Sequence, residues 1–322
     1  MHTTLIANAS GLASSTPGRP GLLALCLLAF GCANLQGGFH VESVEFVARD
    51  GLRCDGYVVW ENAPVTDIVL SMGGSGTGTS AFLPDPAAGM VRSRTAAFIT
   101  FDKPGVHATF GEPSSVHIDD ALFSAHTQGT LLDCAEDALL FSLSRFGPAV
   151  RWHLRGHSEG ATIELFLLDR LIAKRPKDAR RVNTLILSGL PLEPFADNLD
   201  RQLADKPELR RPVDECDWAI MRDQLGVSCG YLKDAASRPS GFVMFARLAR
   251  VRAPARYRFF QGNSDVNTPA TFTHQLEEWN TTTGHLDLVV RYYDGGHAGT
   301  PEVRQEIADL LLSLAPAAAA HR

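Results

Sequence analysis

The chain has 322 residues, of which 45% are hydrophobic and 20% are charged, so it can bury a sizeable core. A formal net charge of −6, a pI near 6.0 and the lack of a long Lys/Arg run exclude a basic surface for nucleic acid. The length fits one large α/β domain with an insertion as well as it fits two domains.

The first 38 residues have the pattern of a leader. Residues 1–20 are rich in Ser, Thr, Gly and Pro, which is typical of disorder. The apolar run at residues 21–30 is too short to span a bilayer as a helix but has the length of a signal-peptide core. Gly31-Cys32 then resembles a bacterial lipoprotein cleavage site, in which the Cys receives lipid. We expect an exported protein, periplasmic or anchored to the membrane through lipid on Cys32; the alternative is a cytoplasmic protein whose apolar segment packs on the domain.

Eight runs either alternate apolar and polar residues or are mainly apolar, and we expect each to form a strand. Asp50-Gly51 lies between the first two runs and is a tight-turn signal, so these two form a hairpin. Helical patterns separate most of the others, which is typical of a parallel sheet. The expected strands are residues 41–47, 52–60, 67–72, 96–102, 150–155, 182–188, 255–260 and 286–293, and the expected helices cover 129–145 and 159–174 and begin near residues 268 and 301.

The sequence Gly156-His157-Ser158-Glu159-Gly160 lies where an expected strand ends and an expected helix begins. A Gly-x-Ser-x-Gly pattern in this context is typical of a nucleophile elbow, a sharp turn that holds a serine in a strained conformation. The two glycines relieve the crowding that side chains would cause there. The helix dipole and the Glu159 amide would stabilise an anion formed on an attacked carbonyl. We therefore expect Ser158 to be a nucleophile.

A glycine cluster at residues 73–80 follows the third expected strand. Gly73 to Gly78 has the spacing of a phosphate-binding Walker A loop, but Thr79 stands where the phosphate-binding Lys belongs, and a long loop follows instead of a helix. We favour another interpretation, in which the loop brings the backbone N–H of Gly74 or Ser75 to the nucleophile as the second oxyanion donor.

Two further polar residues follow later strands. Asp265 lies in the loop after residues 255–260, and His297 lies in the Gly-rich loop after residues 286–293. Asp265 is also compatible with a plain turn, since Asn-Ser-Asp is turn chemistry in any case. However, the carboxyl ends of parallel strands gather at one edge of a sheet, so we expect Ser158, Asp265 and His297 to converge. The imidazole would take the serine proton, and the carboxylate would fix the imidazole tautomer.

The pattern changes at residues 190–252, where charges, prolines and short apolar patches alternate without a buried strand. We expect a helical cap insertion there, over a core made of residues 39–189 and 253–316. Four cysteines and three histidines remain, and two of the cysteines admit alternatives. Cys216 and Cys229 could pair in an exported protein or be loose thiols in a cytosolic one. Cys54 and Cys134 resemble small buried hydrophobes, and His107, His117 and His126 lack tight metal-ligand spacing and are expected at the surface.

Four motifs carry a resemblance to a known family: Phe-Asp-Lys-Pro-Gly-Val at 101–106, Gly-His-Ser-Glu-Gly-Ala at 156–161, Gly-Asn-Ser-Asp-Val-Asn-Thr-Pro at 262–269, and Gly-His at 296–297. From about residue 41 to residue 314 the chain resembles the α/β-hydrolases, specifically serine esterases and prolyl-oligopeptidase-type (S9-like) hydrolases. The resemblance implies the α/β-hydrolase fold, an eight-stranded, mostly parallel sheet flanked by helices with a helical cap. It also implies a Ser158-Asp265-His297 triad and no metal or organic cofactor.

The chain departs from that family in two places. Gly73-Gly74 stands where the group usually has His-Gly before the oxyanion residue. Arg151 and Arg155 make the nucleophile strand more polar than usual, which suggests that one of them faces a cap or loop partner.

These features predict a serine hydrolase that cleaves an ester, a thioester or a small amide through an acyl-enzyme. Two alternatives stay open: an acyltransferase, which differs only in the acceptor that reaches the acyl-enzyme, and a non-catalytic binding protein on a hydrolase scaffold. The expected partner is a small molecule or a short peptide. The cap that would select it carries no readable motif.

Overall fold

The structure, a computed structural model, describes residues 40–61, 64–76, 95–110, 112–204, 206–253 and 255–314. The expected leader with Cys32 lies outside the described residues, as do Gly78 and Thr79 of the glycine cluster. None of the helices in the described ranges is long and apolar enough to cross a membrane.

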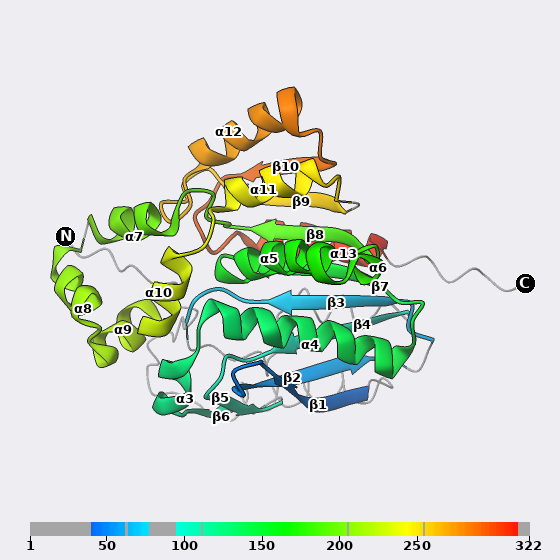
Figure 1. The fold of residues 1–322 in the computed structure, drawn as a ribbon, viewed down its shortest axis with the longest axis horizontal. Helices are drawn as coiled ribbons and strands as arrows, with labels where there is room; N and C mark the ends of the chain where they lie inside the picture. The colour runs from blue at the N-terminus through cyan, green and yellow to red at the C-terminus, as the bar shows by residue number, and fades with distance from the viewer. Residues whose placement is uncertain are drawn as a thin grey trace, which may run out of the picture.

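An eight-stranded sheet runs through the molecule in the order β1-β2-β4-β3-β7-β8-β9-β10 (Figure 1). β1 and β2 form the expected hairpin, β2 is also antiparallel to β4, and all the other neighbours are parallel. The strands are β1 (His40–Val47), β2 (Arg53–Trp60), β3 (Asp67–Met72), β4 (Ala96–Phe101), β7 (Arg151–His157), β8 (Val182–Ser188), β9 (Arg256–Gly262) and β10 (Leu288–Tyr293). This topology confirms the predicted eight-stranded, mostly parallel sheet.

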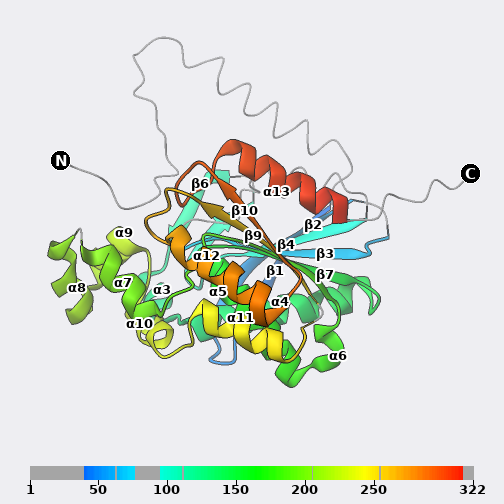
Figure 2. The ribbon, with the colours of Figure 1, turned by 90° about the horizontal axis from the view of Figure 1, so that it is seen from above.

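Helices cover both faces of the sheet (Figure 2). One face carries α4 (Gln128–Phe146), α5 (Glu159–Lys174), the short α6 (Pro176–Ala179), α11 (Gly241–Arg250) and α12 (Ala270–Trp279), and the other carries α13 (Pro301–Leu314). Because side chains alternate along a strand, Ile68 of β3 joins the core beneath α4 and α5, whereas Val69 packs with Ile307 of α13. A strand buried on both faces is mainly apolar, which is why residues 67–72 were recognisable.

A small hairpin and a short helix occupy the region where the sequence predicts a polar loop: β5 (Val106–Thr109), β6 (Glu112–Ile118) and α3 (Asp120–Ala125). His107 and His117 lie at least partly exposed in this hairpin. His126, by contrast, is fully buried, so the prediction that it lies at the surface is wrong. The rings of Phe123 and Tyr231 cover it, at centroid distances of 4.8 and 6.0 Å, and Tyr231 comes from a helix far along the chain.

The region predicted as a cap insertion contributes two kinds of helix. Four helices lie beyond the carboxyl ends of the parallel strands (Figure 1) and are called the cap below: α7 (Phe195–Ala204), α8 (Arg210–Glu215), α9 (Trp218–Leu225) and α10 (Cys229–Ala236), with a 3-10 turn at Pro207–Leu209. α11, from the same insertion, packs instead on α5. The cap has a small apolar cluster of its own around Leu203, Leu209 and Val213.

Two disulfides cross-link these elements. Cys54–Cys134 joins β2 to α4, and Cys216–Cys229 joins the end of α8 to the start of α10. The Cα–Cα separations of 6.3 and 5.7 Å lie within the usual range for disulfides. Cys54 and Cys134 are buried, as predicted, but they are not separate hydrophobes, because the fold brings together two residues 80 positions apart.

The two arginines of β7 bond to the neighbouring strand. Arg151 Nη2 donates to Asp67 Oδ2 at 2.8 Å, and Arg155 Nη1 donates to Ser71 Oγ at 3.0 Å. Asp67 and Ser71 both belong to β3. The expectation that one arginine faces a cap or loop partner is therefore wrong: both bond to β3, and the charge of Arg155 also interacts with that of Glu164, which lies in α5.

Candidate active site

Ser158 lies on a sharp turn between β7 and α5. Its backbone has φ 54° and ψ −115°, a conformation that costs a non-glycine residue about 1 to 3 kcal/mol. Its N–H donates to the carbonyl of Ser188 at 2.8 Å, and its own carbonyl accepts from the N–H of Thr162 at 3.2 Å. The turn is thus fixed by β8 on one side and by the first turn of α5 on the other.

The glycines on either side of the serine allow the strand, the helix and a neighbouring loop to approach closely. A Cβ on Gly156 would lie 2.4 Å from the Cα of Ala161, and one on Gly160 would lie 2.4 Å from the carbonyl oxygen of Met72. A side chain at either position would therefore push α5 away from the sheet. The N–H of Gly160 also donates to the carbonyl of Gly73 at 2.9 Å, which ties the start of α5 to the glycine cluster.

Asp265 and His297 meet beyond the carboxyl ends of β9 and β10. The Nδ1–H of His297 donates to Asp265 Oδ2 at 2.9 Å. Three more donors reach the same buried carboxylate: the N–H groups of Asn267 and Thr268 at 2.9 and 3.0 Å from Oδ1, and the Thr268 hydroxyl at 2.6 Å from Oδ2. This hydrogen-bonded pair and its donors are called the relay below.

The charge state of the relay follows from these contacts. Burial alone would raise the pKa of Asp265, but the hydrogen bond and charge of His297, together with the hydrogen bonds from Thr268, outweigh burial and lower the pKa. An ionised carboxylate can only accept hydrogen bonds. The proton of the neutral imidazole therefore lies on Nδ1, and Nε2 is left as a proton acceptor.

A second histidine, His157, lies between the serine and the relay. A Cβ on Gly74 would lie 3.3 Å from Ser158 Cβ and 3.4 Å from His157 Cδ2. A Cβ on Gly189 would lie 3.3 Å from His157 Cε1 and 2.8 Å from His297 Cε1. The structure thus brings all three predicted residues to one edge of the sheet, with His157 beside both Ser158 and His297. Within the described residues, no direct hydrogen bond joins Ser158 Oγ to His297.

The backbone N–H groups predicted as oxyanion donors come from both sides of the serine. Glu159 opens α5, where the first N–H groups of a helix have no carbonyl partner. Gly74 and Ser75 follow β3, and the contact of Gly74 with Ser158 puts this loop beside the hydroxyl-bearing carbon. Between described residues, no hydrogen bond uses the N–H of Glu159, Gly74 or Ser75.

A buried group of five polar side chains lies between the serine turn and the cap: Lys103, His126, Gln128, Glu159 and Tyr231, called the cap-side cluster below. Lys103 Nζ donates to Glu159 Oε2 at 2.5 Å, with 12% and 2% of the two side chains exposed. Gln128 Nε2 donates to the Tyr231 hydroxyl at 2.8 Å. Burial and the charge of Glu159 raise the pKa of Tyr231 well above its usual value, whereas burial and the charge of Lys103 lower the pKa of His126 to about 3.

Four residues of this region have site contacts that the sequence interpretation missed. His157 lies inside the Gly-x-Ser-x-Gly pentapeptide, and this position beside Ser158 was the sequence signal that could have identified it as a site residue. Thr268 has the pattern of a helix cap, but α12 begins at Ala270 and the Thr268 hydroxyl bonds to Asp265 instead. Lys103 lies in the motif at 101–106, but that motif gives no sign of its partner Glu159, and nothing local marks Gly189, because the neighbours of both residues come from distant parts of the chain.

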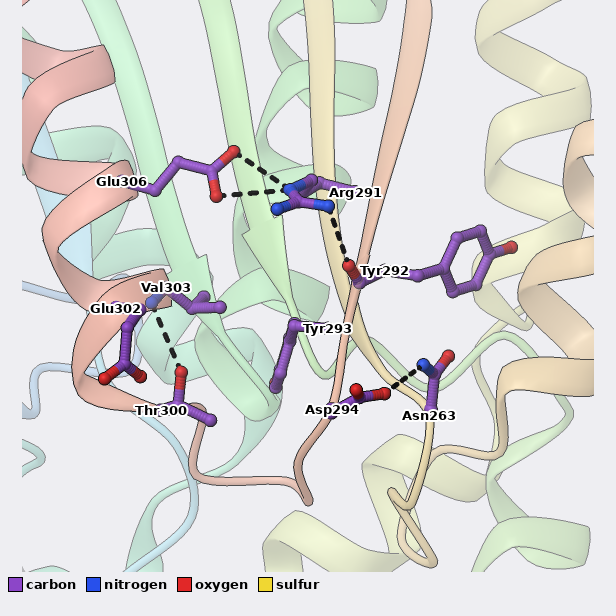
Figure 3. Close-up of a pocket in the computed structure, with 9 residues that line it drawn as sticks. All are labelled: Asn263, Arg291, Tyr292, Tyr293, Asp294, Thr300, Glu302, Val303 and Glu306. Atoms are coloured by element: carbon purple, nitrogen blue, oxygen red, sulfur yellow. Dashed lines mark hydrogen bonds and ion pairs between the residues drawn. The ribbon is translucent and has the colours of Figure 1, made fainter.

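A pocket of about 360 Å³ lies beside the relay, between the end of β10 and the start of α13 (Figure 3). Its lining is mainly polar and includes Asn263, Arg291, Asp294 and Glu306. Arg291 is paired with Glu306, as the dashed lines in Figure 3 show. The lining includes none of Ser158, Asp265 and His297. Among the described residues, no group of three or more His, Cys, Asp or Glu side chains could hold a metal ion.

The comparisons with known proteins support one fold. No family model matches the chain, and no curated protein matches its sequence. A carboxyl esterase from Bacillus coagulans superimposes with a TM-score of 0.60 at 14% identity, over 85% of this chain and 97% of that one. An esterase from Pyrococcus furiosus gives a TM-score of 0.56 at 11% identity, over 85% of this chain and 90% of that one. An acylaminoacyl peptidase from Pyrococcus horikoshii gives 0.56 at 12% identity, over 89% of this chain and 43% of that one.

Identities this low establish architecture rather than chemistry. The superpositions cover 85% or more of this chain, which includes its eight-stranded sheet and flanking helices. The chain has the α/β-hydrolase fold.

Proposed function

We propose that the protein is a serine hydrolase that cleaves an ester, a thioester or a small amide, with Ser158 as nucleophile and the relay as its base. The observation that carries the proposal is the Asp265–His297 hydrogen bond, at the same sheet edge as the strained serine turn. Each part alone has a structural explanation. Their convergence from three separate loops is what a proton-transfer site requires.

The reaction begins when the Ser158 hydroxyl attacks the substrate carbonyl and His297 Nε2 takes the hydroxyl proton. The C–O bond formed makes a tetrahedral oxyanion, which the N–H of Glu159 and that of Gly74 or Ser75 stabilise, at about 3 kcal/mol for one donor. His297 then passes its proton to the leaving group as that bond breaks, which leaves an acyl-enzyme. Water, deprotonated by the same Nε2, attacks the acyl group; His297 then returns this proton to Ser158 Oγ as the acyl C–O bond breaks, which releases the acid and the free serine.

Asp265 keeps its negative charge through this cycle. Its lowered pKa holds the carboxylate ionised at neutral pH, and its hydrogen bond favours the imidazolium that forms when the serine proton moves. The carboxylate takes no proton itself.

Two other functions are compatible with the same scaffold. An acyltransferase would use the same acyl-enzyme and pass the acyl group to an alcohol or thiol, so product analysis with added acceptors separates it from a hydrolase. A non-catalytic binding protein would bind a small molecule or short peptide without turnover. No hydrogen bond between described residues uses His297 Nε2, so this nitrogen is available to take the serine proton, which favours catalysis over mere binding.

The test is turnover of a p-nitrophenyl ester series by the wild type and by Ser158→Ala. The variant should lose all measurable turnover while its melting temperature stays near that of the wild type. Ser313→Ala, on the exposed side of α13, is the matched control and should be fully active. Wild-type turnover by Ser158→Ala would refute the proposal.

We also propose that the protein is exported and that lipid on Cys32 anchors it to a membrane. The two disulfides support an oxidising compartment, because such bonds are rare in cytosolic proteins. Mass spectrometry of the protein purified from its own cells should show loss of residues 1–31 and a lipid mass on Cys32. An N-terminus that retains those residues would contradict the proposal.

A further inference from the structure

Resting on the proposed function, we propose that His157 is a positioning residue for His297. Its ring and the backbone of Gly189 together hold the His297 imidazole in the orientation in which Nδ1 meets Asp265. His157 has no part in the proton transfers described above, yet it lies beside both the nucleophile and the base.

The His297 ring is confined on three sides. The centroid of the His157 ring lies 4.9 Å away, with the two planes inclined at 46°. On another side the backbone of Gly189 approaches so closely that a Cβ there would lie 2.8 Å from His297 Cε1 and 3.0 Å from Nδ1. The third contact is the 2.9 Å hydrogen bond to Asp265. Because His157 and Gly189 occupy two sides of the ring, the imidazole cannot rotate away from Asp265 without colliding with one of them.

His157 is itself held firmly. It ends β7, and its Nδ1 is hydrogen bonded to Ser188 Oγ, 3.0 Å away on the neighbouring strand. Its opposite edge lies against the glycine loop, with Cδ2 3.4 Å from the Cβ position of Gly74. Because Ser188 and Gly74 belong to the sheet and its loops, the position of the His157 ring does not depend on the cap.

The role also requires that His157 stays uncharged, since an imidazolium there would oppose protonation of His297 during the reaction. Burial, followed by the charges of His297 and Arg155, lowers the pKa of His157 to about 3, although Asp265 and the contact with Ser188 partly oppose this. Tyr293 of β10 also lies near Asp265, and burial raises its pKa to about 12. Near neutral pH, His297 therefore has the Asp265 carboxylate on one side and the uncharged ring of His157 on another.

The test compares His157→Ala with His157→Phe. Loss of the ring should lower kcat about 10- to 100-fold with KM within about twofold, because a base misplaced by about 1 Å can lose this much rate. Phe keeps a planar ring without its nitrogens, so it should restore kcat to within about threefold of the wild type.

A second background separates positioning from general destabilisation. In His297→Ala, where no imidazole remains to be positioned, adding His157→Ala should leave the residual rate unchanged. If His157→Ala fails to fold, His157→Leu replaces it. Its kcat should show the same 10- to 100-fold loss, and His157→Phe should again be within about threefold of the wild type. Gly189→Ala places a methyl group against the other side of the His297 ring and should also lower kcat with little change in KM.

Each result has a defined meaning. Wild-type kcat in His157→Ala, or a Phe variant as slow as the Ala variant, would overturn the inference. A loss as complete as that of His297→Ala would also overturn it, because His157 would then be the base itself. Turnover by Ser158→Ala decides the proposed function separately: if that variant is inactive while His157→Ala is normal, only the positioning role fails.

Discussion

The relay and the cap-side cluster are both buried polar groups beside Ser158, but they differ in how completely they are hydrogen bonded. The two oxygens of Asp265 receive four hydrogen bonds. In the cap-side cluster, Glu159 Oε1, Gln128 Oε1 and His126 Nε2 are buried and have no hydrogen-bond partner among the described residues. An unpartnered buried polar group costs about 1 to 3 kcal/mol.

This difference separates two tasks. A fully bonded relay fixes the geometry of the base before substrate arrives, which serves catalysis. The cap-side cluster connects the oxyanion donor Glu159 to the cap through Tyr231 and costs folding energy to maintain. The glycine cluster is also bonded to the cap, because the N–H of Gly76 donates to the carbonyl of Gly226 at 3.1 Å. We therefore expect changes in the relay to act mainly on rate and changes in the cluster to act mainly on stability.

The largest expected effect comes from Asp265→Asn. An amide can donate as well as accept, so it no longer fixes the proton on Nδ1 of His297, and kcat should fall by about 10⁴. Ester turnover measures this, while the melting temperature should change little. Asp294→Asn, at the end of the neighbouring strand, is the control and should keep full activity. A loss below tenfold in Asp265→Asn would mean that the relay is not the base.

The cluster is tested by Lys103→Met, which leaves the Glu159 carboxylate buried and unpaired. The free energy of unfolding should fall by about 3 to 5 kcal/mol, measured by urea denaturation. Lys103→Met/Glu159→Gln removes both charges and should regain much of this loss. Lys174→Met, on the exposed end of α5, serves as control. If the single variant lost under 1 kcal/mol, the ion pair would not be the support we describe.

Acid should destabilise the folded protein, because His126 of the cap-side cluster must be protonated on unfolding. Its folded pKa of about 3 lies below the unfolded value of about 6.5, so the unfolded chain binds the proton first and stability falls as the pH drops from 6.5 towards 3. At pH 5 this costs about 2 kcal/mol relative to pH 8. His126→Phe should lose about 2 kcal/mol less than the wild type over that interval, whereas His117→Phe, at the exposed hairpin, should follow the wild type. Equal losses in all three would contradict the expectation.

A smaller effect is expected at Thr268. Thr268→Val removes the hydroxyl that donates to Asp265 at 2.6 Å, and one hydrogen bond to a charged group is worth about 2 kcal/mol, or roughly tenfold or more in kcat. Thr268→Ser keeps the hydroxyl and should restore the rate. A Val variant with unchanged kcat would show that the backbone donors suffice to hold the carboxylate.

Local patterns were enough to predict the sheet and the serine turn. Four of the six residues at 67–72 are apolar because both faces of β3 are buried, and helix α5 has the bounds expected from its periodicity. Asp265 and His297 were predictable as site candidates because they follow strands of one parallel sheet, whose ends share an edge.

Contacts between distant segments were not predictable in the same way. His126 is buried by Tyr231, from a cap helix whose placement no local pattern gives. The Cys54–Cys134 bond needs the register of β2 against α4, and the Lys103–Glu159 pair needs the β4 loop to reach α5. The part of the site that faces the cap was therefore missed, while the part built on strand ends was anticipated.

The most direct measurement of the central claim is labelling with a fluorophosphonate, followed by peptide mass spectrometry, on the wild type and His297→Ala. Labelling requires a serine activated by its base, so the wild type should carry one adduct on Ser158 and the variant should label far more slowly. An adduct on another residue, or an equal rate in His297→Ala, would contradict the assignment of Ser158 and His297 as nucleophile and base.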